Sequence, residues 1–397
     1  MIRPKLAILL LAVPALAASW RFGAIWDGAK TWKNACITTQ GDRIQSVGAC
    51  PEGAADLSRF TALPGLIDVH THMTYVLDNR VSASARAAAV VYLAQDNARK
   101  TLATGVTTVR DLGAADYADI AMRDLINAGR MTGPRMFVAG YGLQITRGRT
   151  PTPNTADGPA EVLRVVRQQI GAGADVVKMY GSTGSGRDVT GFQTFTFEEM
   201  KAAVDAAHAL GKRIAIHAYG PDGARDAVRA GADSVEHATD MDDSTIAEMV
   251  RRKTFYVPTI DHNRYYVDNA RMLNYPAGAA DDLNGYIQRN LETARKAFRA
   301  GVRFAMGSDA VYTMFGENTR ELGWFVKAGM TPEQALAAAT TAAAELLGME
   351  KSLGALRPGY LADIAAVEGD PLANIDAVIH GVRWVMKNGE VVVDKTR

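Results

Sequence analysis

Four of the seven histidines stand where short apolar segments give way to loops. Two of them, His70 and His72, close the stretch LPGLIDVHTHM with a single threonine between them. Alternate residues of a strand point to the same side, so both imidazoles can bind one ion. Imidazoles together with a carboxylate suit Zn²⁺ and related divalent cations. The other members of this set, at the ends of later apolar segments, are Lys178, His217, His237 and Asp309.

Lys178 is the chemically unusual member of the set. An ammonium beside two cations would be repelled, but a buried lysine shifts its pKa readily and can hold a neutral amine. A neutral amine reacts with carbon dioxide to give an anionic carbamate, which can bridge two metal ions. Any one of these residues alone is more often an ordinary core or surface group. Their shared place at segment ends is what predicts a metal site.

The elements that would position these residues alternate along the middle of the chain. Short β-rich segments each lead into a helical pattern, which predicts a parallel sheet. Eight such units predict a closed (β/α)₈ TIM-like barrel, whose reactive groups come from the C-terminal ends of different strands. An open doubly wound sheet is the rival, but no G-x-G-x-x-G follows an early strand. The segments begin at residues 65, 106, 135, 174, 213, 234, 254 and 303.

Both chain ends contain short strands and turns without helical repeats. We expect residues 19–62 and 354–397 to form a small β-sandwich domain, and residues 63–353 to form the barrel. Cys36 and Cys50 flank a strand–turn–strand pattern. A disulfide between them would contribute roughly 3 kcal/mol of stability in an oxidising compartment. Two unpaired buried cysteines are the alternative.

The first residues predict export. A short basic segment precedes an apolar run and the small-residue pattern Ala15-Leu16-Ala17, as in a signal peptide over residues 1–18. The run is short for a membrane span and contains Pro14. A buried strand and an uncleaved anchor are the alternatives. We expect a periplasmic or secreted protein whose mature chain has no membrane span.

Composition narrows the class of partner. The 44 basic and 43 acidic residues leave a formal charge of +1. The chain therefore lacks the excess of positive charge that is typical of proteins that bind nucleic acid or an anionic membrane. Hydrophobic residues make up 48% of the chain, as in a soluble globular protein. The expected partner is therefore a small-molecule or dipeptide substrate, and the sequence is compatible with a homo-oligomer.

The segment-end motifs resemble those of a known group of enzymes. PGLIDVHTH, VVKMY, IAIHAYG, SVEH and GSDA are similar to the motifs of the amidohydrolase superfamily, in its binuclear form with a carboxylated lysine. The similarity continues in GENTRELGWFVKAGMTPEQALAAAT and LGALRPGYLADIAAVEGDPL. Within the superfamily, the chain resembles the branch of imidazolonepropionase-like proteins, Xaa-Pro dipeptidases and related carboxypeptidases.

This resemblance implies a role for each member of the set. Two divalent ions, most plausibly zinc, would be bridged by a hydroxide and by N6-carboxylated Lys178. Asp309 would take a proton from the attacking hydroxide and pass it to the leaving nitrogen. The implied ligands of the first ion are His70, His72 and Asp309, and those of the second are His217 and His237.

Substrate contacts are expected from the loops. Tyr219, in HAYG, resembles the tyrosine that contacts the substrate in related carboxypeptidases. Tyr141 stands where several relatives carry a histidine, and His262 follows the seventh strand and could reach the pocket. A loop arginine could bind a carboxylate, although a solvated arginine is the ordinary interpretation of each candidate. These candidates are Arg147, Arg149 and Arg187.

The sequence therefore predicts a binuclear metal-dependent hydrolase that cleaves an amide bond in a dipeptide or N-acyl amino acid. A cyclic-amide hydrolase or deaminase that acts on a small heterocycle is the alternative enzyme. A metal-binding protein without catalysis is disfavoured, because the whole hydroxide-bridging set is present.

Overall fold

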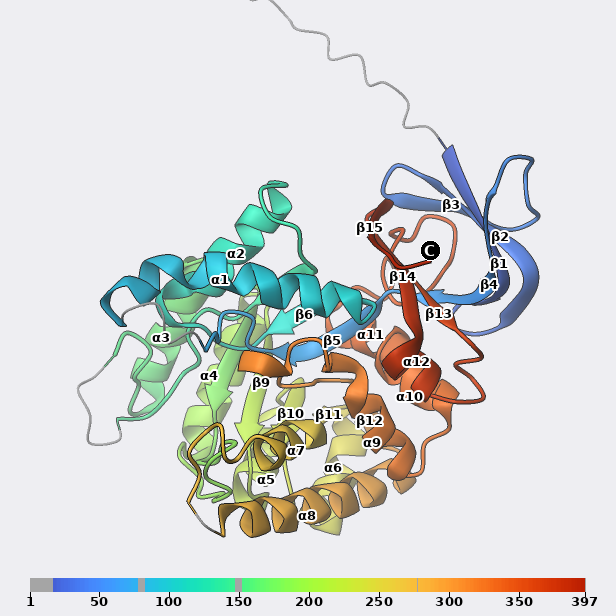
Figure 1. Cartoon of the computed structure of the whole chain (residues 1–397). Helices are drawn as coiled ribbons and strands as arrows, with labels where there is room; N and C mark the ends of the chain where they lie inside the picture. The colour runs from blue at the N-terminus through green and yellow to red at the C-terminus, as the bar shows by residue number, and fades with distance from the viewer. Residues whose placement is uncertain (1–16, 78–82, 147–151, 277, 397) are drawn as a thin grey trace, which may run out of the picture.

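The computed structural model describes residues 17–77, 83–146, 152–276 and 278–396 (Figure 1). The expected signal peptide, residues 1–18, lies almost entirely outside them. The first strand, β1 (Ala17–Trp26), begins at the end of that segment. Within the described residues, no helix has the length and apolar character that a membrane crossing requires.

Eight strands form the centre of the fold, and they lie side by side in chain order and run parallel. Their residues are almost all buried, as expected for parallel strands that are covered on both faces. The predicted alternation of strands and helices is confirmed. The eight strands are β5 (Leu66–Thr71), β6 (Val106–Asp111), β7 (Arg135–Val138), β8 (Val176–Tyr180), β9 (Arg213–Ala218), β10 (Ser234–His237), β11 (Phe255–Val257) and β12 (Arg303–Phe304).

Backbone hydrogen bonds connect the three-stranded sheet β5–β7 with the five-stranded sheet β8–β12 at both of their edges. At the β7–β8 edge, the Leu143 amide donates to the Lys178 carbonyl at 2.8 Å. At the β12–β5 edge, the Val69 amide donates to Met306 at 2.8 Å, and the Asp309 amide donates to His70 at 2.7 Å. This arrangement is a TIM-barrel-like α/β fold, in which all eight strands end on the same side.

Helices lie around the strands (Figure 1). Local sequence fixes several helix ends: Thr196 and Glu199 form a capping box at the start of α4, and the Asp242 side chain caps α6. The helices are α1 (Ala83–Ala103), α2 (Ala118–Asn127), α3 (Pro159–Gly171), α4 (Phe197–Ala209), α5 (Pro221–Ala230), α6 (Asp243–Arg252), α7 (Ile260–Asp268), α8 (Ala279–Arg299), α9 (Glu321–Lys327), α10 (Pro332–Ala338), α11 (Thr341–Leu346) and α12 (Asp376–Gly381), with 3₁₀ turns at Ala115–Tyr117, Tyr312–Met314 and Asn318–Arg320.

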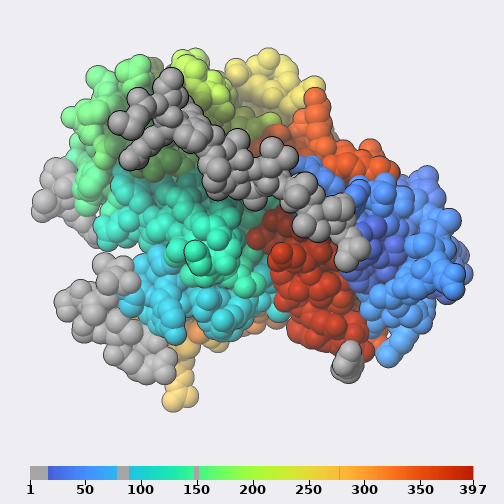
Figure 2. Space-filling view, turned by 90° about the horizontal axis from the view of Figure 1, so that it is seen from above, coloured from blue at the N-terminus to red at the C-terminus, as the bar shows by residue number. Residues whose placement is uncertain are grey.

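Strands from both chain ends share one further sheet, and Figures 1 and 2 show the two ends side by side. A sandwich was expected here, and the described residues form one hydrogen-bonded seven-stranded sheet with a core of its own, which includes Phe22, Ile37 and Trp384. Antiparallel pairing of β13 with β4 joins the two ends. In spatial order the strands are β15 (Glu390–Asp394), β14 (Val382–Lys387), β13 (Ile364–Glu368), β4 (Ala55–Pro64), β1, β2 (Thr31–Gln40) and β3 (Arg43–Gly48).

Gly65 connects this sheet to the first strand of the site. Its amide donates to the Asp363 carbonyl at 2.8 Å, and a Cβ at this position would lie 2.3 Å from the Thr107 hydroxyl oxygen. A residue without a side chain is therefore needed immediately before LIDVHTH. Asp363 also accepts a hydrogen bond of 2.6 Å from Arg135 on β7, which fixes the terminal sheet against the strands that carry the histidines.

Cys36 and Cys50 form a disulfide, which decides between the two alternatives left by the sequence. Their Cα atoms lie 4.9 Å apart, because β2 pairs with β3 and places Cys36 opposite Gly48. The bond closes the β2–β3 hairpin at its open end.

Replacing both cysteines, Cys36→Ser with Cys50→Ser, should lower the free energy of unfolding by roughly 3 kcal/mol, because the unfolded chain regains the freedom of the closed loop. Urea unfolding of the oxidised wild type and the double variant measures this difference. Reduced wild type is the control and should unfold like the variant. Equal stability of all three forms would show that the disulfide does not constrain the hairpin.

Candidate metal centre

The six residues predicted as metal ligands lie together at the carboxyl ends of the strands. All of them are buried, and all line one cavity of about 550 Å³. They come from five strands or from the residues that follow them: His70 and His72 from β5, Lys178 from β8, His217 from β9, His237 from β10 and Asp309 after β12.

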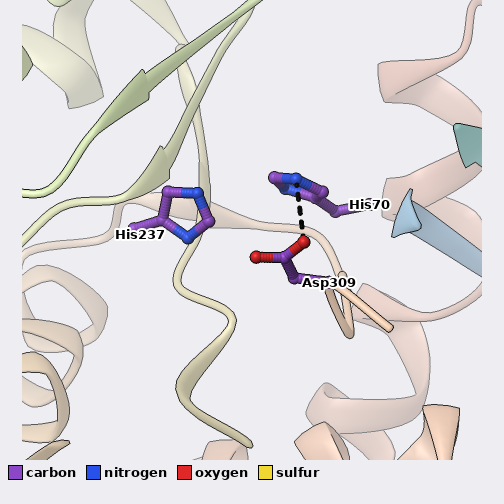
Figure 3. Close-up of side chains that lie close together, drawn as sticks. All are labelled: His70, His237 and Asp309. Atoms are coloured by element: carbon purple, nitrogen blue, oxygen red, sulfur yellow. Dashed lines mark ion pairs between the residues drawn. The ribbon is translucent and has the colours of Figure 1, made fainter. Parts of the chain in front are cut away.

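The tightest group comprises His70, His237 and Asp309, whose donor atoms all lie within 4.8 Å of one another (Figure 3). His70 Nε2 lies 3.5 Å from Asp309 Oδ1, and His72 Nε2 lies 3.3 Å from the same oxygen. The His217 ring packs edge-on against His237, with centroids 4.5 Å apart. Four imidazoles, those of His70, His72, His237 and His262, therefore surround the Asp309 carboxylate, and the ring of His217 lies beside them.

The hydrogen-bonding pattern of these groups fits a metal ion. His70 Nε2, His217 Nε2 and Asp309 Oδ1 are buried and have no hydrogen-bond partner among the described residues. Three rings have a partner at Nδ1: His70 Nδ1 lies 2.8 Å from Glu236, His72 Nδ1 lies 3.0 Å from the Gly113 carbonyl, and His237 Nδ1 lies 2.6 Å from the Thr259 hydroxyl. Such partners fix the ring and leave the other nitrogen free to bind a metal.

The backbone is strained at two of these positions. His237 and Asp309 have φ angles of 74° and 52°, which place them in the left-handed region that few non-glycine residues adopt. Strained backbone of this kind concentrates at functional sites, where the surrounding structure holds it.

Electrostatics favours neutral imidazoles at His70 and His217 and a charged carboxylate at Asp309, whereas Asp309 raises the pKa of His72 against the effect of burial. Burial, followed by the charge of Lys178, lowers the pKa of His70 to about 4 and the pKa of His217 well below its usual range. Burial opposes ionisation of Asp309, but His262, His70 and His72 together lower its pKa well below the usual range. Burial lowers the pKa of Lys178 to about 8, so an appreciable fraction of its amine is neutral near neutral pH.

A buried ion pair missed by the sequence reasoning holds His70 in place. Glu236 lies 2.8 Å from His70 Nδ1 and accepts a hydrogen bond of 2.9 Å from Arg110. Arg110 also donates to the Ser234 hydroxyl and the Val69 carbonyl, and so links β5, β6 and β10. Burial opposes ionisation of Glu236, but Arg110 and His70 lower its pKa to about 2. The available signal was a charged residue inside an apolar strand, as in VTTVRD and SVEH.

A second buried acid, Asp68, fixes the segment that carries Asp309. It accepts hydrogen bonds from the Ser308 amide at 2.9 Å, the Ser308 hydroxyl at 2.6 Å and the Asn318 side chain at 2.9 Å. Asn318 belongs to the GEN sequence that follows the last strand. The hydrogen bonds tie this loop to β5 and keep Asp309 beside the histidines.

Of the three expected substrate contacts, two line the cavity. Tyr219 stacks on His217 with ring centroids 5.1 Å apart, and its buried hydroxyl has no hydrogen-bond partner among the described residues. His262, on α7, lies with its Nδ1 2.7 Å from the Asp309 carbonyl. Tyr141 is placed elsewhere: it does not line the cavity, and its hydroxyl donates to Asp116 at 2.9 Å. This position does not support the predicted substrate contact.

Five tyrosines are among the described residues that line the cavity. Tyr219 was expected there from the sequence, whereas the other four were missed because they come from separate parts of the chain. Of the loop arginines considered, Arg187 lines the cavity, whereas Arg147 and Arg149 lie outside the described residues. The lining tyrosines are Tyr75, Tyr180, Tyr219, Tyr266 and Tyr312.

A TIM-barrel-like fold with buried imidazoles and a carboxylate at its strand ends is the arrangement of a metal-assisted hydrolase. Residues 61–392 match the model of the amidohydrolase family, and the chain belongs to that family. It is a hydrolase that acts on C–N bonds, and its relatives support cleavage of an amide bond.

Three known proteins show the extent of the similarity. Ochratoxinase from Aspergillus niger is 30% identical over 349 residues, which cover 79% of this chain and 71% of that protein. Imidazolonepropionase from Rhizorhabdus wittichii is 25% identical over 387 residues, which cover 86% of this chain and 88% of that protein. The crystal structure of a Xaa-Pro dipeptidase with methionine bound in its active site has a TM-score of 0.87 at 31% identity, covering 95% of this chain and 99% of that one. The expected superfamily and branch are confirmed.

The variant Glu236→Gln should weaken metal binding by about 10- to 100-fold, because a neutral amide orients His70 less firmly and makes its imidazole less basic. Competition with a chelator of known affinity measures the change, and urea unfolding of the metal-free protein separates it from lost stability. Glu248→Gln, which removes a partly exposed acid of α6 paired with Arg251, is the control. Wild-type metal affinity in Glu236→Gln would contradict the orienting role.

Proposed function

We propose that the protein is a binuclear metal-dependent amidohydrolase that cleaves dipeptides or N-acyl amino acids. The observation that carries the proposal is the convergence of all six expected ligands on one cavity, where several of their donor atoms lack a protein partner. Its volume of about 550 Å³ lies in the range of small-molecule sites and is large enough for a substrate of dipeptide size.

The ligand roles are those that the family resemblance implies. His70, His72 and Asp309 would hold one ion, and His217 and His237 would hold the second. Lys178, in an N6-carboxylated form, would be a ligand shared by the two ions. Two bound divalent ions, most plausibly zinc, would lower the pKa of a water and polarise the scissile carbonyl.

Asp309 is the proton carrier in this proposal. Its carboxylate accepts a proton from the attacking water and passes it to the leaving nitrogen, so that the leaving group departs as a neutral amine. His262 supports this role, because its Nδ1 bonds to the Asp309 backbone carbonyl at 2.7 Å and lies 3.3 Å from Asp309 Oδ2. The free hydroxyl of Tyr219, on the same wall, is placed to orient the substrate carbonyl or carboxylate.

The relatives support an amino-acid amide as the substrate. The similar Xaa-Pro dipeptidase holds methionine in its active site, and several lining residues of the present cavity are tyrosines. Aromatic walls bury apolar side chains, and the hydroxyls supply polar contacts. The relationship to imidazolonepropionase keeps a cyclic amide as the second candidate.

Two further proposals concern the architecture. The hydrogen bonds at both sheet edges support a closed barrel made by residues 63–353. The separate core of the terminal sheet supports a small domain built from residues 19–62 and 354–397, rolled into a sandwich.

Export is also proposed, and the Cys36–Cys50 disulfide supports it, because such bonds persist in oxidising compartments. N-terminal sequencing of periplasmic material should then find a chain that begins at Ala18 or Ser19. Met1 retained in a membrane fraction would indicate an anchor instead.

Wild-type protein should carry close to two divalent ions per chain, and Lys178→Ala should carry far less metal, because it removes the shared ligand. Elemental analysis of the purified proteins measures the ratio. Lys201→Ala, which removes an exposed lysine paired with Asp205, is the matched control. Full metal content in Lys178→Ala would exclude the bridging role.

The substrate class is tested with a panel of dipeptides, N-acyl amino acids and small heterocyclic amides. We expect hydrolysis of compounds with a free carboxylate next to the scissile nitrogen. Conversion of that carboxylate to an amide should reduce kcat/KM by about tenfold or more, because a charge-assisted contact of about 1.5–3 kcal/mol is lost. Attack on ring amides or exocyclic amines alone would favour the heterocycle alternative.

Asp309→Asn is the catalytic control for this panel. The amide has nearly the same shape as the carboxylate but cannot accept the proton, so turnover should fall by about 10²–10⁴-fold. Near-normal kcat in a metal-loaded variant would remove Asp309 from the proposed role.

A further inference from the structure

Arg187 lies in the loop between β8 and α4, and its side chain lines the same cavity as the histidine cluster. Apart from Lys178, it is the one lysine or arginine among the described residues that line this cavity. The one lining carboxylate is Asp309, which belongs to the histidine cluster. Arg187 is an exposed residue, so the cavity is lined by a solvent-accessible guanidinium for which its described lining supplies no separate acidic partner.

The guanidinium is held by contacts that leave part of it free. Its Nη2 donates to the Leu273 carbonyl at 2.8 Å, and its central carbon lies 5.2 Å from the centroid of the Tyr275 ring. No carboxylate pairs with it anywhere in the described ranges. A guanidinium has five N–H donors, so donors remain after these contacts.

The loop that carries Arg187 is itself fixed against the cavity wall. The Tyr275 hydroxyl donates to the Gly186 carbonyl at 2.7 Å. A Cβ at Gly186 would lie 2.0 Å from the Tyr266 ring, so the backbone can approach this wall only because the residue is glycine. These contacts fix the backbone next to Arg187, and the contacts with Leu273 and Tyr275 position its guanidinium.

We propose that Arg187 binds the carboxylate of the substrate on the leaving-group side of the scissile amide. The inference rests on the proposed function and deepens it, since it assigns the carboxylate contact to one residue. A guanidinium matches a carboxylate in planarity and can donate two parallel hydrogen bonds to it. Arg187 thereby selects dipeptides and N-acyl amino acids over their neutral amides.

The test combines a change in the protein with the matching change in the substrate. The kcat/KM of wild type, Arg187→Gln and Arg187→Lys is measured on the fastest dipeptide of the panel and on its C-terminal amide. Wild type should prefer the free acid by about 10- to 100-fold, the range expected for a hydrogen bond to a charged group. In Arg187→Gln this preference should disappear, through loss of activity on the free acid alone.

Arg187→Lys should recover part of the preference, because it restores the charge without the planar fork. Arg225→Gln, which removes an exposed arginine of α5, is the control and should keep the wild-type preference. A thermal melt of each variant shows whether the loop contact to Leu273 matters for stability.

Each outcome separates this inference from the proposed function. An undiminished preference for the free acid in Arg187→Gln would overturn the role of Arg187 and leave the proposed function standing. Equal losses on both substrates with a lowered melting temperature would show a structural role and also overturn it. If wild type hydrolyses both compounds without preference, the role of Arg187 is overturned and amide hydrolysis stands. If no dipeptide or N-acyl amino acid of the panel is hydrolysed, the proposed function fails and the inference falls with it.

Discussion

The buried ion pair between Arg110 and Glu236 is the contact on which the candidate metal centre depends. It lies between buried strands, where an unpaired charge would be costly, and hydrogen bonds among three strands satisfy both groups. Through Glu236 the pair reaches His70 directly. The contact that compensates the buried charges therefore also orients the imidazole of His70, a candidate metal ligand.

The remaining candidate ligands are also positioned by contacts with other residues of the protein. Each ring that can bind with one nitrogen is held through the other or by stacking, and Asp309 is placed by the hydrogen bonds that Asp68 makes to the following loop. Strain at His237 and Asp309 is tolerated because the neighbouring backbone is bonded on both sides. Contacts within the protein therefore orient the residues of the candidate metal centre.

Much of this arrangement could be predicted from sequence, because the strand pattern and the ligands are local signals. The predicted segments at 106, 135, 213, 234 and 303 begin where β6, β7, β9, β10 and β12 begin. The Arg110–Glu236 contact could not be read in this way, since its members lie 126 residues apart. Whether the two cysteines pair depends on the register of β2 with β3, which the sequence does not specify. The position of the Tyr141 side chain depends on its contact with Asp116, whose left-handed φ of 54° has no clear signature in the local sequence. Arg187 was one of three similar loop arginines until the fold placed it against the cavity.

The pairing of β4 with β13 has a consequence for the order in which the chain can fold. The register sets Leu63 against Ala365, so the edge of β4 has no native partner until nearly the whole chain has been synthesised. Until then β1–β4 present an open row of backbone donors and acceptors, which is a template for pairing with other chains. Contacts this far apart in sequence also form slowly. Formation of the terminal sheet is thus a stage of folding at which a nascent chain is exposed to aggregation. Pairing of β13 with β4 then fixes both ends of the chain together.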